Sequence, residues 1–456
     1  MKFPSSMSSL AQKISRETEK VEMYFRDRGL PLPSFDADAP GDFENLPEDI
    51  ARSRREVIQT TSELRDLMVS PKERVRWLAW DFLGTQSLQL LSHFGIPKLV
   101  PIEGTITLTE LQSKTTLDPT NLARVLRHAM TKRIFIEPSP GVIAHTAASR
   151  LLVEDESLNA WVGFNTEDIY PASSHVLEAI TKYPEATNLT RTGFNVAFNT
   201  VDQEPMFVTF GKDPKRARRM ALAMSSLTGG EGYEVSYLVN EDIFSDIDAR
   251  GGTLVDMGGS HGFISVDLAK RYRNMRFIVQ DLPKTVSSAP NPISDDTQVV
   301  ERVVFQAHDF FTPQVAKDAD VYFFRWIIHN YSKPYAVQIL RNLIPALKPG
   351  ARIVINDICL KEPGMETPWN EQLIRSMDMV MMTLLNAQER QEWEFRELFE
   401  LADKGFVFKG ITRPKGCRLS IVNAVWKPDE VGKNFSLGLA SGLGSGEDRN
   451  EVNGKI

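Results

Sequence analysis

Cysteine is nearly absent from this chain. Only Cys359 and Cys417 occur among 456 residues, which is too few for a disulfide-stabilised scaffold or a zinc site built from cysteines. The chain also lacks a run of about eighteen apolar residues, which a membrane-spanning helix needs. Its first residues lack the apolar segment of a secretory signal peptide. We therefore expect a cytoplasmic protein without a membrane partner.

Clustered positive charge is missing as well. Lys and Arg together number 53 against 60 Asp and Glu, so the formal net charge is −7. Because nucleic-acid-binding domains usually carry a basic patch, we expect no nucleic-acid partner. A hydrophobic content of 42% with charges of both signs is typical of globular proteins. The length exceeds that of a usual single domain, so more than one domain is expected.

The third absence is the dinucleotide fingerprint Gly-x-Gly-x-x-Gly. The sequence GGTLVDMGGSHG at residues 251–262 has instead Gly258, Gly259 and Gly262 after a short apolar run. Apolar residues at helical spacing follow over residues 263–272, so the segment predicts a strand, a tight turn and a helix. Such a turn lets a ligand approach the backbone closely. The alternative is a glycine-rich connection that binds nothing.

Polar residues follow the apolar runs that come next in the chain. Asp281 ends a second run about 20 residues after the glycine turn, where an acidic side chain can accept hydrogen bonds from ribose hydroxyls. Asp309 and Phe310 follow a third run, and Arg325 and His329 lie at the end of a fourth. Open α/β sheets place their ligands at the carboxyl ends of their strands, so we expect these residues along one sheet edge.

Four sequence motifs together resemble those of a known family. They are VDMGGSHG, QDLPK, HDFF and RWIIHNYS, and they look like successive motifs of S-adenosylmethionine-dependent O-methyltransferases of the caffeic acid type. The likeness is greatest to the fungal secondary-metabolite members and covers about residues 70–427. It implies an α/β, Rossmann-like class I methyltransferase domain with a seven-stranded sheet. It also implies an N-terminal, mainly helical, winged-helix-like dimerisation domain.

The resemblance assigns a cofactor and its binding residues. S-Adenosylmethionine is expected as methyl donor, with no metal. Arg325 stands where the plant enzymes have lysine, and Ser260-His261 where they have a further glycine. The residues expected to hold the cofactor are Gly258, Gly259, Asp281 (on the ribose), Asp309, Phe310 and Arg325.

His329 is the predicted general base. A phenol has a pKa of about 10, whereas histidine has one of about 6.5, so a histidine within hydrogen-bond reach can take the phenolic proton during transfer. Such catalysis typically contributes ~10²–10⁴-fold. The alternative is a histidine that merely satisfies a loop carbonyl. We expect His261 and His308 to be wall residues of the cofactor cleft.

Two carboxylates are candidates for orienting the base. In the family, two glutamates bracket the catalytic histidine; Glu389 matches one of them, whereas Asp357 is one methylene shorter than the other. We therefore expect Glu389 to be the better partner of His329. The alternative for both is a solvated loop carboxylate.

The chain is predicted to divide into four segments. The winged-helix-like segment has a helix over residues 77–93 and a hairpin near residue 140. Its Arg124, Arg127 and Lys132 leave DNA binding open as an alternative. The segments are a helical extension (1–70), the dimerisation domain (71–150), a helical linker with the methyltransferase domain (151–427) and a disordered tail (428–456).

Two helical stripes have two possible roles. The resemblance implies that Met220 and Met224 contact the cofactor or an aromatic substrate, but methionines on a helix can also be ordinary core. The apolar residues of the helix over 369–386 can line an acceptor pocket or form core in the same way. Taken together, the motifs and the resemblance predict an enzyme that methylates a hydroxyl of an aromatic small molecule, such as a phenolic polyketide. The resemblance also implies that it works as a homodimer. Two alternatives stay open: transfer to nitrogen or carbon of another small molecule, and a catalytically silent scaffold that keeps the cofactor cleft.

Overall fold

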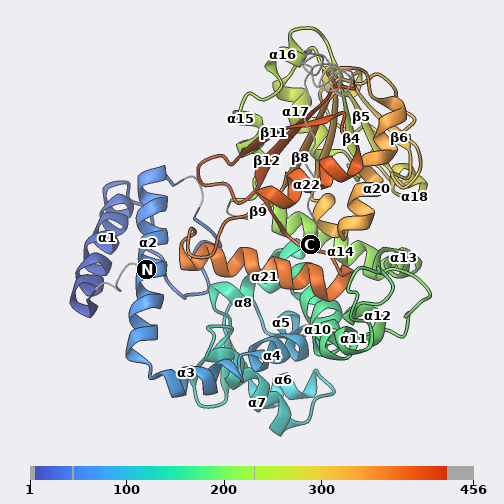
Figure 1. The fold of residues 1–456 in the computed structure, drawn as a ribbon. Helices are drawn as coiled ribbons and strands as arrows, with labels where there is room; N and C mark the ends of the chain where they lie inside the picture. The colour runs from blue at the N-terminus through green and yellow to red at the C-terminus, as the bar shows by residue number, and fades with distance from the viewer. Residues whose placement is uncertain (1–5, 44–45, 231, 429–456) are drawn as a thin grey trace, which may run out of the picture. The chain divides into compact units, whose positions relative to one another are not determined.

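The protein is described here by a computed structural model that covers residues 6–43, 46–230 and 232–428. The predicted disordered tail lies outside these residues apart from residue 428. The chain forms two compact units (Figure 1). The first comprises Met1–Glu234 and Lys361–Gln388, and the second comprises Val235–Leu360 and Glu389–Ile456. The predicted boundaries at residues 70 and 150 fall inside the first unit and stay predictions, and the predicted 151–427 segment contributes to both units.

Helices open the first unit. α1 (Met7–Asp27) packs against α2 (Glu48–Met68), within the segment predicted as a helical extension. The single helix predicted over residues 77–93 is wrong, because α3 (Pro71–Leu78) and α4 (Phe82–His93) are separate. The amides of Trp80 and Leu83 bond to carbonyls three residues earlier, at 2.9 and 3.0 Å, which is the tighter 3₁₀ pattern. Neither glycine nor proline marks this break in the sequence.

A small winged-helix-like module follows in the same unit. Thr107 and Glu110 form a reciprocal capping box on α6 (Leu108–Ser113), and Asp118 caps α7 (Pro119–Met130). The predicted hairpin is present, and its Glu137 accepts a forked bond from Arg127 at 2.8 and 2.9 Å. This pairing engages one of the arginines on which the DNA-binding alternative relied. The elements are α5 (Ile96–Leu99), β1 (Ile106–Thr107), α6 (Leu108–Ser113), α7 (Pro119–Met130), β2 (Ile136–Ser139) and β3 (Val142–Ala144), with the strands in the order β1-β3-β2.

The remaining helices of the first unit share an apolar core. Met220, Met224 and Met377 pack against this core, as the core interpretation of the two stripes expects. The helices are α8 (Ala147–Glu154), α9 (Glu156–Phe164), η1 (Asn165–Ile169), α10 (Tyr170–Ser174), α11 (Val176–Lys182), α12 (Gly193–Ala197), α13 (Met206–Lys212), α14 (Pro214–Thr228) and α21 (Pro368–Leu385).

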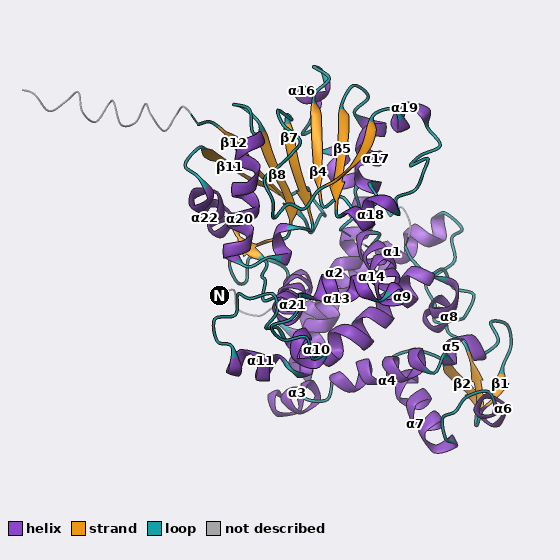
Figure 2. Ribbon diagram, turned by 90° about the vertical axis from the view of Figure 1, so that its right-hand side faces the viewer, coloured by secondary structure: helices purple, strands orange, loops and turns teal. Residues whose placement is uncertain are grey.

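The second unit is built on the predicted seven-stranded sheet, which Figure 2 shows as a row of orange arrows. Five neighbouring strands pair in parallel. At one side β12 pairs antiparallel with β8 and β11 pairs antiparallel with β12, so β12 runs opposite to the other six strands. The strands, in spatial order, are β11 (Phe406–Thr412), β12 (Ser420–Trp426), β8 (Arg352–Asp357), β7 (Val321–Arg325), β4 (Thr253–Met257), β5 (Arg276–Asp281) and β6 (Val303–Ala307). A separate parallel pair consists of β9 (Cys359–Leu360) and β10 (Arg390–Gln391).

Helices cover this sheet, so its central strands are mainly apolar, with polar and charged residues toward their carboxyl ends. β7 is buried along its whole length, as expected for a parallel strand covered on both faces. α17 packs against β5 and β6, and α22 packs against β11 and α20. The helices are α15 (Ser236–Asn240), α16 (Ser245–Asp248), α17 (Phe263–Arg271), α18 (Pro283–Ser287), α19 (Thr297–Val300), η2 (Ile328–Asn330), α20 (Lys333–Leu343), η3 (Ile344–Ala346) and α22 (Glu392–Ala402).

None of the helices within the described ranges is long and apolar enough to cross a membrane.

Candidate active site

The carboxyl ends of the parallel strands meet along one edge of the sheet. Strand register pairs Met257 with Gln280 and Arg325 with Asn356, so the segments that follow β4, β5, β7 and β8 emerge side by side. The sheet thereby brings together the sequence-predicted residues, which are spread over more than a hundred positions of the chain. Ligands of open α/β sheets bind at this edge.

The glycine turn after β4 is held close to β5. The amides of Gly258 and Gly259 both donate to the Gln280 carbonyl, at 2.8 and 3.0 Å. Gly258 and Gly262 have φ angles of +72° and +75°, which side-chain-bearing residues rarely adopt. A Cβ at Gly259 would lie 2.6 Å from Cγ of Asp256. The turn therefore requires glycine and presents mainly backbone to a ligand.

Asp256, which the sequence analysis did not single out, supports this turn from below. Its carboxylate is buried and accepts a 2.7 Å hydrogen bond from the Ser265 hydroxyl on α17. Burial raises the pKa of Asp256 to about 6, although the bond from Ser265 acts in the opposite direction. The hydrogen bond between Ser265 and Asp256 joins the end of β4 to the first turn of α17. The glycine turn is the segment that connects these two elements.

Asp281 lies directly beside the glycine turn. Its Oδ2 accepts the Ser260 amide at 2.9 Å, and its Oδ1 accepts the Leu282 amide at 2.8 Å. Each carboxylate oxygen has a second lone pair, so both can still accept a bond from a ligand. The backbone thus fixes the orientation of Asp281 in advance.

His308, Asp309 and Phe310 follow β6, and the His308 amide donates to the Asp281 carbonyl at 2.9 Å. Asp309 is exposed and accepts the Phe311 amide at 2.9 Å, while a Cβ at Gly258 would lie 3.5 Å from the ring of Phe310. Nε2 of His308 is buried and has no hydrogen-bond partner in the part of the chain that the structure describes. Burial also lowers the pKa of His308, so its ring favours the neutral form.

Arg325 lies deeper than the other predicted cofactor residues. Its guanidinium donates to Oδ1 of Asn356, whose amide donates in turn to the Ser420 carbonyl at 3.0 Å. Burial lowers the pKa of Arg325 to about 10, despite the nearby Cys417, Asp357 and Asp256. Arg325 therefore braces β7 against β8 and β12 beneath the edge of the sheet.

His329 and Glu389 form a buried pair. Nδ1 of His329 lies 2.8 Å from Oε1 of Glu389, and both side chains are almost fully buried. Asp357 makes a different contact, because its Oδ2 accepts the backbone amide of His329 at 3.0 Å. Burial alone would lower the pKa of His329, but the carboxylates of Glu389 and Asp357 outweigh it and raise the pKa.

Trp326 adds a wall beside this pair. Its ring centroid lies 5.0 Å from that of His329, and its backbone has a φ of +56°, unusual for a bulky residue. Strained backbone of this kind is concentrated at functional sites.

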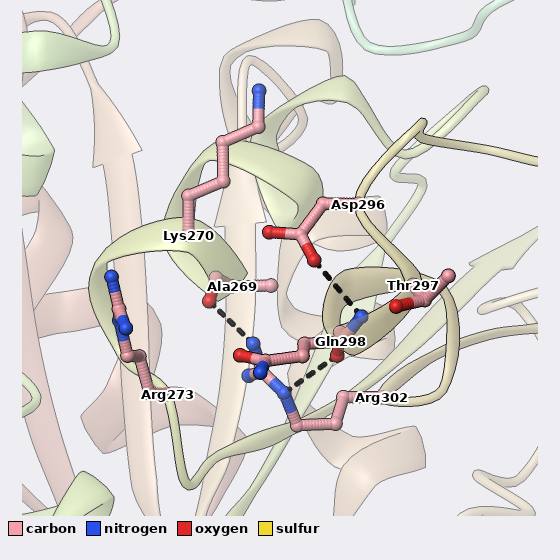
Figure 3. A pocket seen from close by; sticks show the side chains of 7 residues that line it. All are labelled: Ala269, Lys270, Arg273, Asp296, Thr297, Gln298 and Arg302. Atoms are coloured by element: carbon pink, nitrogen blue, oxygen red, sulfur yellow. Dashed lines mark hydrogen bonds between the residues drawn. The ribbon is translucent and has the colours of Figure 1, made fainter.

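In the part of the chain that the structure describes, no metal cluster adds to this site, and one surface hollow of the second unit lies away from the glycine turn. Across residues 6–43, 46–230 and 232–428, no group of three or more His, Cys, Asp or Glu side chains is arranged to hold a metal ion. Figure 3 shows a hollow of about 260 Å³ near the carboxyl end of α17, the end remote from the glycine turn. Arg302 in its wall donates to the carbonyls of Ala269, Tyr272 and Met275, at 2.7–3.0 Å. This arginine thus caps a helix.

Comparison with known proteins identifies the family. The family model for the O-methyltransferase domain matches residues 188–407. A chlorophenol O-methyltransferase from Trichoderma longibrachiatum is 59% identical over 422 residues, which are 92% of this chain and 90% of that protein. The chain belongs to the O-methyltransferase family. Its predicted enzyme class and its resemblance to fungal members are confirmed.

Solved structures support the fold of this family member. The structure entitled OxaC in complex with SAH and oxaline has a TM-score of 0.68 at 22% identity and covers 92% of this chain and 100% of its own. A structure entitled "A Pericyclic Reaction enzyme" has a TM-score of 0.69 at 20% identity and covers 91% of this chain and 100% of its own. The predicted fold class is confirmed, and the same fold serves an enzyme named for different chemistry.

Sequence reasoning missed three parts of this O-methyltransferase site. Asp256 and Trp326 appeared there only as parts of the motifs VDMGGSHG and RWIIHNYS. Arg390 was passed over, although it lies next to Glu389 in the chain. A charged residue inside an otherwise apolar strand, as at Asp256, is a signal that was available. The contacts of Arg390 join residues about 60 positions apart, for which the sequence carries no local signal.

Proposed function

We propose that this protein transfers the methyl group of S-adenosylmethionine to the hydroxyl of a phenolic small molecule, with His329 as general base. The observation that carries the proposal is the buried contact of 2.8 Å between Nδ1 of His329 and Oε1 of Glu389. A histidine whose Nδ1–H is held by a carboxylate keeps Nε2 as a proton acceptor.

The glycine turn and its neighbours suit S-adenosylmethionine. The backbone-lined turn leaves room for an amino-acid tail, and Asp281 is oriented beside it by two amide bonds. Asp309 and Phe310 follow the neighbouring strand, with Phe310 close to Gly258. The donor supplies an electrophilic methyl group on a positively charged sulfur. We assign Gly258, Gly259, Asp281, Asp309, Phe310 and Arg325 to its binding.

His329 performs the proton transfer in the proposed reaction. Nε2 of His329 takes the proton of the acceptor hydroxyl while the oxygen forms its bond to the methyl carbon. The carbon–sulfur bond breaks in the same step, and its electron pair stays on sulfur. Glu389 stabilises the resulting imidazolium, whereas Asp357 holds the backbone of the turn through the His329 amide.

Phenols are the proposed acceptor class. A relative with 59% identity is named for chlorophenols, so chlorinated phenols are the first acceptors to test, together with phenolic polyketides. Formation of S-adenosylhomocysteine, measured over such a panel, tests the activity. If the protein methylates amines or carbon acids, and His329→Gln retains full activity on them, the alternative of transfer to nitrogen or carbon is favoured instead.

Cofactor binding is tested separately by calorimetry with S-adenosylhomocysteine. Asp281→Ala should weaken binding at least tenfold, because two ribose hydrogen bonds to a charged group are lost. Asp267→Ala is a matched control, since Asp267 lies in the same unit and its carboxylate forms an ion pair with Lys270 at 3.5 Å. If the unaltered protein does not bind S-adenosylhomocysteine, the methyltransferase proposal is contradicted. A catalytically silent scaffold, or an enzyme that uses this fold for a different reaction, would then be favoured.

We also propose that the protein is a homodimer. α3 has no buried residue, and its Trp77 and Leu78 are 57% and 66% exposed; Met68, Val75, Trp80 and Phe82 nearby are also exposed. Contiguous exposed apolar side chains of this kind mark association surfaces. Trp77→Glu combined with Leu78→Glu should yield monomers in sedimentation experiments. Leu177→Glu, at an exposed leucine outside this segment, should leave the mass unchanged. The cytoplasmic location stays a prediction.

A further inference from the structure

The turn that carries His329 is held by a fully buried arginine. Arg390 is only 2% exposed, and its guanidinium donates to the carbonyl of Ile328 at 2.9 Å and to that of Tyr331. These carbonyls lie one residue before and two residues after His329. Arg390 therefore fixes the 3₁₀ turn η2 from both sides of the histidine.

Arg390 reaches the turn from a defined strand pair. In β10 it is aligned with Cys359 of β9, two residues beyond Asp357, and it directly follows Glu389. Three charged side chains consequently act on one turn. Glu389 binds the imidazole, Asp357 accepts the His329 amide, and Arg390 binds the two flanking carbonyls.

The chemistry of these contacts suits arginine in particular. A planar guanidinium presents several N–H groups in a rigid fork, so one side chain can bind two carbonyls at once, whereas lysine carries a compact point charge on a flexible stem. A buried cation is costly to desolvate. Placing one beside the base, rather than an apolar residue of similar volume, therefore points to a role in the reaction.

We propose that Arg390 is a positioning residue for methyl transfer, which fixes the turn that aims the imidazole of His329 at the acceptor hydroxyl. This inference rests on the proposed function, because it takes His329 as the base. A second consequence is electrostatic. The positive charge of Arg390 opposes protonation of His329 and so counteracts Glu389 and Asp357, the carboxylates that act on the same ring.

The test compares Arg390→Met and Arg390→Lys with the unaltered protein. Arg390→Met removes the charge and both carbonyl bonds, so kcat should fall roughly 10–100-fold through misplacement of the base. The acid limb of kcat/KM should move to higher pH by about one unit, since a nearby positive charge is lost. Arg390→Lys keeps the positive charge, so the acid limb of kcat/KM should stay at the same pH. Its kcat should fall about tenfold, because lysine cannot bind both carbonyls as the guanidinium does.

Arg302→Met is the matched control. Arg302 also binds backbone carbonyls, but at the far end of α17 in the hollow of Figure 3. Its loss should lower the melting temperature without moving the acid limb. If Arg302→Met moved the acid limb of kcat/KM as far as Arg390→Met does, the shift would reflect a general loss of structural stability. That result would overturn the proposal.

Histidine resonances give a readout that does not depend on activity. The seven histidines can be labelled with ¹⁵N, and the signal missing in His329→Gln assigns His329. Its titration should move up by about one unit in Arg390→Met and stay in place in Arg390→Lys. Unchanged titration and unchanged kcat in both variants would overturn the inference. If the unaltered protein methylates no phenol, the proposed function fails, while the titration still decides whether Arg390 acts on His329.

If Arg390→Met does not fold, Arg390→Lys decides. Retained binding of S-adenosylhomocysteine with a kcat reduced about tenfold would support a positioning role. A kcat within twofold of the unaltered value would overturn it.

Discussion

At the residue scale, the pairing of His329 with Glu389 makes the proposed proton transfer depend on pH. The pKa of His329 is raised because the carboxylates of Glu389 and Asp357 outweigh burial. A general base works only in its neutral form, so activity should fall as the pH drops through this raised pKa. We expect the acid limb of kcat/KM above the ordinary histidine value of about 6.5.

Glu389→Gln should shift this limb in the opposite direction. The amide keeps a hydrogen-bond acceptor near Nδ1 but removes the negative charge, so the pKa of His329 should fall and the limb should move to lower pH. The maximal rate should also decrease, because the imidazolium is less well stabilised. A pH profile of kcat/KM measures both effects, and a limb that does not move would exclude Glu389 as the group that sets the pKa.

A second prediction at this scale concerns the acidity of the acceptor. Chlorine substituents withdraw electrons and make a phenol more acidic, so a trichlorophenol is largely ionised at neutral pH and needs a base less. His329→Gln should therefore lose ~10²–10⁴-fold in kcat/KM with an unsubstituted phenol, and much less with 2,4,6-trichlorophenol. His93→Gln, at an exposed histidine of the first unit, is the control. Equal losses with both acceptors would contradict a base role.

At the element scale, the β4–α17 connection requires glycine at position 259 because a side chain would not fit there. Gly259 does not have the positive φ of Gly258 and Gly262. A Cβ at Gly259 would lie 2.6 Å from Asp256 and 2.8 Å from Val279, so Gly259→Ala must displace the turn. Affinity for S-adenosylhomocysteine should fall at least tenfold, since the backbone that meets the ligand moves. Gly211→Ala, where no atom lies within 4 Å of the added carbon, should bind normally in the same calorimetric experiment.

Elements that local sequence determines were predictable. The strands, the glycine turn and the capped helix at Asp118 follow from apolar runs, glycines and a capping residue within a few positions. Contacts between distant segments were not predictable in this way. Arg390 was missed because its partners lie in another element, and Asp357 was assigned to the imidazole although it accepts the amide of His329. The break between α3 and α4 has no glycine or proline to announce it.

At the scale of the whole molecule, all the residues assigned to the cofactor and to the base belong to the second of two compact units. The chain passes between the units after Glu234, Leu360 and Gln388, so each unit contains segments that are far apart in sequence. Ligand binding to one unit need not protect the other, because local stability differs between cooperative parts of a protein.

Hydrogen exchange should therefore separate the two units. S-Adenosylhomocysteine at 100 times its Kd stabilises the state that binds it by about 2.7 kcal/mol. Amides in β4, the glycine turn and β5 should then exchange about a hundredfold more slowly, whereas those of the winged-helix-like module over residues 96–144 should keep their rates. Equal protection in that module would mean that the two units open together and that cofactor binding is felt throughout the chain. Protection confined to β4, the turn and β5 would assign the cofactor to the second unit alone, and would leave the first unit free to serve dimer formation.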